Sequence, residues 1–146
     1  MKETEKAYIA GIIDGEGCIY ISVSKCKSQR AVSITYHLGL RISNNNVSML
    51  NWVLEKIGFG SIYHYPRKRG IDNTHELYWS AKQASKILQL VYKYIVSKKD
   101  QADIAIKFQD FKNSNHWGRY NPISDEDSQY MSIQKQSLMD IHKNKT

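Results

Sequence analysis

Two different spacings of hydrophobic residues divide this chain into segments. Between residues 18 and 24 apolar and polar residues alternate, with Ile19, Ile21 and Val23 on one side, as expected of a half-buried strand. Residues 31–42 alternate in the same way, whereas other segments repeat their apolar residues every three to four positions, as helices do. The pattern predicts helices over 3–14, 47–57, 82–96, 98–112 and 124–143, and strands over 18–24, 31–42, 61–67 and 75–81.

The order of these segments predicts the fold class. A helix, two strands, a helix and two strands are followed by three further helices. Because this length suits one domain, we expect residues 1–146 to form a single α+β domain. The four strands most simply form one antiparallel sheet in an αββαββα core, with helices covering one face and C-terminal helices added. The first helix is apolar on nearly every side and should be buried on more than one.

Composition narrows the class of protein. Hydrophobic residues make up 41% and charged residues 24% of the chain, which is typical of a globular domain and excludes a disordered or collagen-like one. No apolar run is long enough to span a membrane, and the charged N-terminus is not followed by the apolar segment of a signal peptide. The two cysteines have no partner set of cysteines or histidines, so we expect a reducing compartment and neither a disulfide scaffold nor a zinc finger.

The distribution of charge points to a polyanionic partner. The net charge is +7, and the stretch from residue 17 to residue 80, with eight basic and three acidic residues, carries +5 of it. The chain also contains ten tyrosines. Basic and aromatic residues together favour nucleic acid as the partner, while a merely basic, well-solvated surface is the simpler interpretation.

The segment Ile9–Gly17, with the sequence IAGIIDGEG, resembles the LAGLIDADG motif of the homing endonucleases. Its nine positions match the motif in order and residue type, with isoleucine for both leucines and Glu16 for the second aspartate. The predicted order of helices and strands also agrees with the αββαββα order of that family, so the resemblance spans residues 7–111. It implies that the chain has the family's fold and cleaves both strands of DNA.

The resemblance also implies where the chemistry takes place. In the family the second acid of the motif binds metal, which places Glu16 and the adjacent Gly15 in a metal site. Mg²⁺ or another divalent metal held by carboxylates activates water and stabilises a leaving oxygen, so we expect it as the cofactor. Lys98 matches a family lysine near the scissile phosphates, and Asn44 matches a polar residue that orders catalytic water. From the residues alone, Lys98 equally suits a solvated helix start and Asn44 a plain helix cap.

Small residues within the motif predict an interface between chains. Gly11 and Gly15 lie four positions apart and so share one helical face, which lets two helix backbones approach closely; Gly15 also suits a plain helix end. One motif supplies one Glu16 where the family's active site uses two, which implies a homodimer on an approximately palindromic target. The expected interface residues are Ala7, Ala10, Gly11, Asp14 and Gly15, with Asp14 structural rather than catalytic.

The outward-facing polar residues of the strands are the candidates for DNA recognition, because a β-ribbon fits the major groove. Arg41 and Arg67 could each pair with guanine, and Glu76 could accept a hydrogen bond from cytosine. Basic residues at the turns suit phosphates better than bases. The strand candidates are Tyr20, Ser22, Ser24, Thr35, His37, Arg41, Ser61, Tyr63, Tyr65, Arg67, Glu76, Tyr78 and Ser80, and the turn candidates are Lys25, Lys27, Arg30, Lys68 and Arg69.

The sequence as a whole predicts a site-specific, metal-dependent double-strand DNA endonuclease of the intron- or intein-homing type. We expect it to bind double-stranded DNA as a homodimer. We do not expect it to bind a membrane. We expect an intracellular location, in the cytoplasm of a prokaryote or in an organelle. The alternative is a non-cleaving relative, either an RNA-splicing maturase or a DNA-binding regulator on the same fold. A basic interaction module without enzyme activity is a third interpretation.

Overall fold

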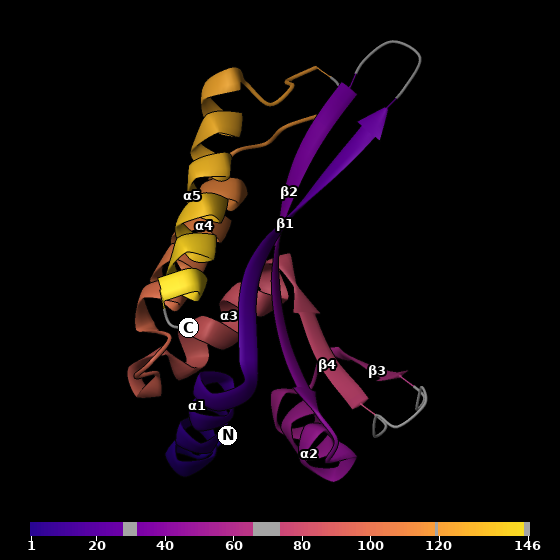
Figure 1. Cartoon of the computed structure of the whole chain (residues 1–146), viewed down its shortest axis with the longest axis vertical. Coiled ribbons are helices and arrows are strands. Elements are labelled where there is room, and N and C mark those ends of the chain that lie inside the picture. Colours follow the sequence, from indigo (N-terminus) through magenta and orange to yellow (C-terminus); the bar gives the residue numbers. More distant parts are fainter. Residues whose placement is uncertain (28–31, 66–73, 119, 145–146) are drawn as a thin grey trace.

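The structure, a computed structural model, describes residues 1–27, 32–65, 74–118 and 120–144. Figure 1 shows its elements in chain order. They are α1 (Glu3–Glu16), β1 (Gly17–Lys27), β2 (Val32–Asn44), α2 (Val47–Ile57), β3 (Ser61–Tyr65), β4 (Thr74–Ser80), α3 (Ala81–Val91), the 3₁₀ turn η1 (Tyr92–Tyr94), α4 (Lys99–Ser114) and α5 (Asp125–Asn144). The predicted order is confirmed. Within the described residues, no helix is both long and apolar enough to cross a membrane.

The strands form one antiparallel sheet, as predicted. Within the described residues it has four strands in the order β1-β2-β4-β3, so β2 and β4 are the inner strands. In the register of β2 and β4, Leu40 lies opposite Trp79 and Ile42 lies opposite Leu77. All four side chains are fully buried, so this face of the sheet is the core face. The α+β class expected from the sequence is therefore confirmed.

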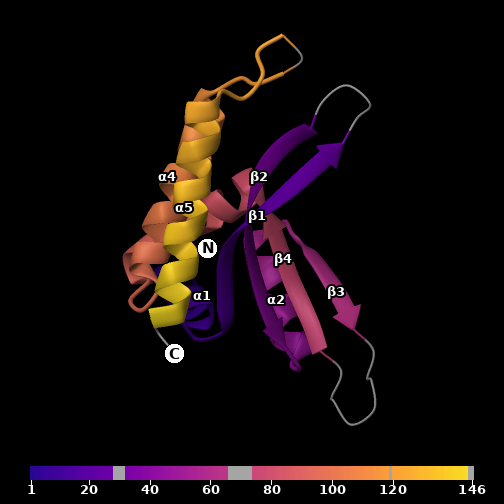
Figure 2. The same ribbon diagram turned by 45° about the horizontal axis from the view of Figure 1, so that its top comes forward.

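The helices cover the core face and leave the other face open. Helices α4 and α5 pack beside the ribbon of β1 and β2, whereas β3 and β4 lie on the far side of the molecule from them (Figure 2). At the opposite end from the tip of the β1–β2 hairpin, α1 and α2 lie side by side (Figure 1). Buried Ile9 and Ile13 of α1 and Phe108 of α4 join their helices to the core beneath the sheet. The α1–α2 pair therefore lies at one end of the molecule, and the strands of the sheet extend away from it (Figure 1).

Some predicted boundaries were wrong, for identifiable reasons. Residues 25–27, expected in a turn, continue β1, and Val23, expected on the core side, is 42% exposed, because the outer part of the β1–β2 hairpin diverges from α4 and α5 (Figure 2). The helix expected over 82–96 ends at Val91, where the chain tightens into η1. The N-cap of helix α1 is Lys2, whose backbone N–H donates to the Glu5 carboxylate at 2.7 Å. In contrast, α2 has the predicted bounds because Asn46 caps its start and Gly58 ends it.

Helix α1 passes into β1 without any loop, and Gly17 makes this possible. A Cβ atom at residue 17 would lie 2.6 Å from the backbone oxygen of Ile13, which is closer than real Cβ atoms come. The backbone at Gly17 is already extended, with φ −72° and ψ 144°, so the strand begins directly after Glu16. Glycine is needed here for close approach and not for an unusual φ angle. As a result, Glu16 sits at the corner where the helix meets the sheet.

Candidate functional site

Glu16 is exposed at the C-terminal end of α1 and is held there by Asn44. The Asn44 side-chain amide donates a hydrogen bond to one carboxylate oxygen of Glu16. Asn44 is itself oriented, because its side-chain oxygen accepts from the backbone N–H of Asn46 at 2.7 Å. The structure therefore brings together two of the predicted catalytic residues, which are 28 positions apart in the sequence. Asn44 ends β2 without capping α2, since that cap is Asn46.

Asp14 joins the end of α1 to the start of α4. Its carboxylate accepts hydrogen bonds from the backbone N–H groups of Val96, at 2.7 Å, and Lys98, at 3.0 Å. Partial burial alone would raise the pKa of Asp14, but the backbone N–H groups of Val96, Lys98 and Ser97 outweigh it and hold the pKa below its ordinary value. A carboxylate that is engaged in this way has a structural role, as the sequence predicted for Asp14.

We expect Asp14→Asn to lower the free energy of unfolding by about 1–3 kcal/mol at pH 7, because an amide has only one oxygen to accept from two backbone donors. The lowered pKa means that the carboxylate stabilises the fold above its unfolded pKa and loses this effect as pH falls through the lower folded value. The difference between wild type and variant should therefore shrink in acid. Urea unfolding of both proteins at several pH values measures it, with Asp140→Asn, at an exposed position on α5, as the control. A difference that stays constant with pH would contradict this role.

Lys98 also contacts the end of α1, but through its side chain. Its ammonium group donates to the backbone oxygen of Ile13 at 3.0 Å and to that of Asp14. A cation at a helix C-terminus offsets the partial negative charge of the last carbonyls. The ammonium group of Lys98 is therefore engaged with backbone oxygens at the end of α1, the helix end that also carries Glu16.

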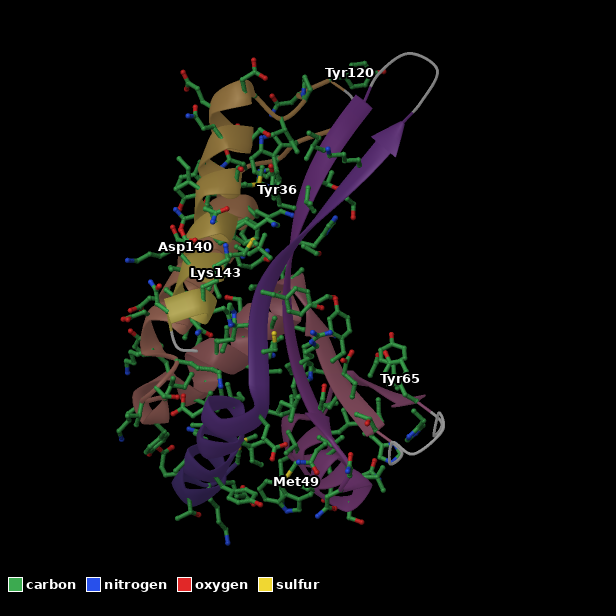
Figure 3. All side chains as sticks on the ribbon, in the orientation of Figure 1. Tyr36, Met49, Tyr65, Tyr120, Asp140 and Lys143 are labelled. Atoms are coloured by element: carbon green, nitrogen blue, oxygen red, sulfur yellow. The ribbon has the colours of Figure 1, made fainter. Side chains whose placement is uncertain are left out.

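The surface beside Glu16 is formed jointly by α1 and α2, and we call it the α1–α2 face. It comprises Ala7, Tyr8, Gly11, Gly15, Met49 and Trp52, which line two adjoining hollows. The rings of Tyr8 and Trp52 meet edge to face with centroids 5.3 Å apart, and Figure 3 shows Met49 between the two helices. Of the predicted interface residues, Ala10 is fully buried in the chain's own core, so it does not belong to this face. Asp14 is tied to α4, as described above.

The second surface is the side of the sheet away from the core, which we call the open face. The strand candidates that the structure describes all lie on it, exposed or partly exposed, and Tyr63 and Tyr65 are about half exposed. Figure 3 shows Tyr65 projecting at the end of β3. Lys25 is exposed in β1 and not in a turn. Four predicted residues lie outside the described residues, as does the side chain of Lys27; the four are Arg30, Arg67, Lys68 and Arg69.

Polar contacts fix several side chains of the open face. Arg41 forms an ion pair with Glu76, with 3.5 Å between nitrogen and oxygen, and Ser43 donates to the same carboxylate oxygen at 3.4 Å. Burial, followed by the charge and hydrogen bond of Tyr78, raises the pKa of Tyr20 to about 12, so its hydroxyl stays neutral at physiological pH. Burial and the nearby Lys112 ammonium group lower the pKa of His37, which keeps its ring neutral near pH 7. The open face therefore offers both donors and acceptors.

Sequence reasoning missed some of these residues. The ring nitrogens of His64 and His75 lie 2.7 Å apart across β3 and β4, a pairing that the sequence did not indicate. No third ligand joins this pair to form a metal site, because the described part of the chain contains no group of three or more histidine, cysteine or acidic residues that could hold a metal ion. Tyr8, Met49 and Trp52 were not predicted on the α1–α2 face. Their spacing identifies apolar helix residues but not which of them stay uncovered.

Comparison with known structures identifies the fold. I-CvuI, a homing endonuclease in complex with its target, is 15% identical, with a TM-score of 0.74 over 95% of this chain and 82% of that one. I-Vdi141I, an archaeal intron-encoded homing endonuclease complexed with DNA, is 20% identical, with a TM-score of 0.74 over 97% and 86%. The meganuclease I-SmaMI bound to DNA is 17% identical, with a TM-score of 0.69 over 90% of this chain but only 43% of its own. All three share this arrangement of helices and sheet.

Comparison of sequences identifies the family. A search of curated proteins found no significant match. A model of the LAGLIDADG endonuclease family, however, matches residues 9–115, which is well over half of the chain and includes both Glu16 and Lys98. The match contains the motif at the end of α1 and all four strands of the sheet. On this ground, and in agreement with the resemblance of the motif, the protein belongs to the LAGLIDADG endonuclease family.

Proposed function

We propose that this protein is a site-specific endonuclease that cuts both strands of a long, approximately palindromic DNA target as a homodimer. The observation that carries the proposal is the position of Glu16. It is an exposed carboxylate, oriented by Asn44, at the corner between the α1–α2 face and the open face. A phosphodiester held on the open face would come close to this carboxylate. The membership of the family and the DNA complexes of I-CvuI and I-Vdi141I support the same conclusion.

A divalent metal fits the donors present at this corner. Glu16 supplies a carboxylate, and the backbone of the exposed Gly15 supplies a carbonyl oxygen, both of which are hard ligands suited to Mg²⁺. Mg²⁺ commonly keeps several waters and completes its shell with substrate phosphates, so one carboxylate per chain is a sufficient protein contribution. When bound, the metal would lower the pKa of a water and polarise the phosphate. I-CvuI complexes have been determined with Ca and with Mg.

Two copies of the chain are needed in this proposal, since each supplies one Glu16. The α1–α2 face is the surface suited to pairing, because Gly11 and Gly15 leave open space where a second helix could approach. The ring of Tyr8 and the thioether of Met49 add apolar area to this face. The coverage of I-SmaMI supports this stoichiometry, as 90% of this chain corresponds to 43% of that longer one. Two copies here would match one chain there.

Cleavage of a randomised library tests the proposed function directly. The protein is incubated with a pool of duplexes in the presence of Mg²⁺, and the cut ends are sequenced. We expect a single target with approximate two-fold symmetry, cut on both strands, and no cutting when Mg²⁺ is replaced by EDTA. Cutting without sequence preference, or none at all on any duplex, would contradict the proposal. The RNA-splicing alternative finds no support in the matched structures, which are complexes with DNA.

Lys98 should stabilise the reacting phosphate in addition to the end of α1. We expect Lys98→Met to lower the single-turnover cleavage rate by roughly a hundredfold with little change in target affinity, because a positioned cation acts mainly on the transition state. The matched control is Lys99→Met, since the Lys99 ammonium group also donates to a backbone oxygen, that of Tyr92, at 2.8 Å. Both variants should lose some stability. If they lose rate equally, or if Lys98→Met loses only affinity, the role assigned to Lys98 is wrong.

Specific binding should weaken steeply as salt is added. Each copy carries the five basic residues predicted to contact phosphates, so two copies would engage about ten phosphates. Counterion release then gives a slope of roughly −5 to −10 for log K against log salt concentration. Fluorescence anisotropy with a labelled target duplex, measured over a series of KCl concentrations, determines this slope. A slope near zero would exclude the phosphate contacts that we assign to these residues.

A further inference from the structure

Among the basic residues that the structure describes on the open face, Arg41 is held in place by contacts with neighbouring side chains. It lies on β2, an inner strand of the sheet, and its side chain is 46% exposed. Its Nη1 atom is 3.5 Å from Glu76, and Cys18 lies directly across the strands from it. A guanidinium has five N–H donors, so the contact with Glu76 leaves enough for two parallel bonds to a further acceptor. Its position away from the hairpin tips directs it toward base edges rather than phosphates.

The ring of Tyr20 forms a wall against which Arg41 rests. The Arg41 guanidinium carbon lies 5.3 Å from the centre of this ring, within the range of a cation–π contact. Tyr20 lies opposite Gly39 in the register, and a Cβ atom at residue 39 would lie 2.5 Å from the tyrosine ring. The absence of a side chain at Gly39 thus leaves room for the ring over β2.

Glu76 is the ion-pair partner of Arg41 on the open face. One of its carboxylate oxygens receives both Arg41 and Ser43, and its side chain is only 16% exposed. A half-exposed arginine held beside a less exposed carboxylate is a positioned donor whose charge is partly neutralised. Such a donor loses less conformational freedom on binding than a mobile arginine, and its attraction to phosphates is reduced.

We propose that Arg41 reads one guanine in each half of the target by donating two hydrogen bonds to O6 and N7 in the major groove, and that Glu76 is its positioning residue. This inference rests on the proposed function. A bidentate arginine is the commonest specific contact to guanine, because the fork of donors matches the two acceptors. Arg41 lies three residues along β2 from Asn44, a separation of ~10 Å, so the guanine lies about three base pairs from the cut phosphate.

The experiment measures the base preference first and its chemical cause second. The wild type, Arg41→Lys, Glu76→Gln and the control Lys107→Gln, at an exposed position on α4, each select duplexes from a randomised pool. The guanine identified for the wild type is then replaced by 7-deazaguanine, which lacks N7, or by inosine, which keeps O6 and N7. Binding of each duplex is measured by anisotropy in Ca²⁺, so that cleavage does not interfere.

We expect the wild type and Lys107→Gln to select guanine at two symmetric positions, and Arg41→Lys and Glu76→Gln to lose this preference. For the wild type, 7-deazaguanine should weaken binding by about 5- to 150-fold, the loss typical of a bidentate contact, whereas inosine should have little effect. Glu76→Gln should bind unrelated duplexes at least as tightly as the wild type, since it removes a negative charge together with the positioning contact. Preferences unchanged in Arg41→Lys, or equal binding of 7-deazaguanine and guanine, would overturn the inference and leave the endonuclease function intact. A wild type that binds no duplex would overturn both.

Discussion

Glu16→Gln should abolish DNA cleavage while leaving affinity for the target within about tenfold of the wild type. Glutamine has the size of glutamate, and its side-chain oxygen can still accept from Asn44, so the local arrangement of α1 and β2 is retained. What is lost is the negative charge that a divalent metal requires. Single-turnover cleavage in Mg²⁺ and equilibrium binding in Ca²⁺ measure the two quantities separately.

The control for this prediction is Glu126→Gln, which removes the same charge from an exposed position in the first turn of α5. It should cleave at the wild-type rate, because the first turn of α5 lies at the end of that helix away from the corner that holds Glu16 (Figure 1). If Glu16→Gln cleaves nearly as fast as the wild type, Glu16 is not in the active site. If its affinity falls by much more than tenfold, its main contribution is to binding.

Gly11→Leu should separate the two copies and thereby prevent double-strand cutting. In a single chain nothing lies within 4 Å of a Cβ atom at Gly11, so the leucine itself is accommodated. Replacing glycine within a helix should even stabilise the monomer by about 0.5–1 kcal/mol. Against a second α1, by contrast, the added side chain overpacks the contact at about 1–3 kcal/mol, which weakens the dimer by roughly 5- to 150-fold. Sedimentation should give twice the chain mass for the wild type and lower values for the variant.

Ser132→Leu is the matched control, since it adds the same apolar side chain at an exposed position on α5. It should remain dimeric and active, which separates a specific effect at the α1–α2 face from a general effect of surface leucine. Thermal unfolding shows whether the fold of Gly11→Leu is retained. A wild type that sediments as a monomer and still cuts both strands at low concentration would exclude the homodimer.

Much of the fold could be predicted from the sequence because local signals agreed with it. The alternation of residues in β1, β2 and β4 identified the core face, and capping residues at both ends identified the bounds of α2. The motif located Glu16 because a short pattern carries that information. Alternation failed at Val23, because it cannot indicate where a hairpin diverges from the helices that cover it.

Contacts between distant segments could not be predicted from local patterns. Arg41 and Glu76 are 35 residues apart and were assigned to two different bases, but the register of β2 and β4 makes them partners. Ala10 was assigned to the interface because α1 is apolar nearly all round, and only tertiary packing decides which apolar side faces the core. The contact of Lys98 with the carbonyl groups of α1 likewise depends on how α4 docks against α1.

The direct passage of α1 into β1 at Gly17 restricts where this chain can change in length. One residue inserted at this junction would turn every side chain of β1 to the opposite face, because the period of a strand is two. Tyr20 would then point into the core, and Ile19 and Ile21 into water. The same insertion would turn α1 by about 100° relative to the sheet. Insertions and deletions during the evolution of this chain should therefore occur beyond the ends of the strand pairs. They should be absent from this junction, where no residue separates the helix from the strand.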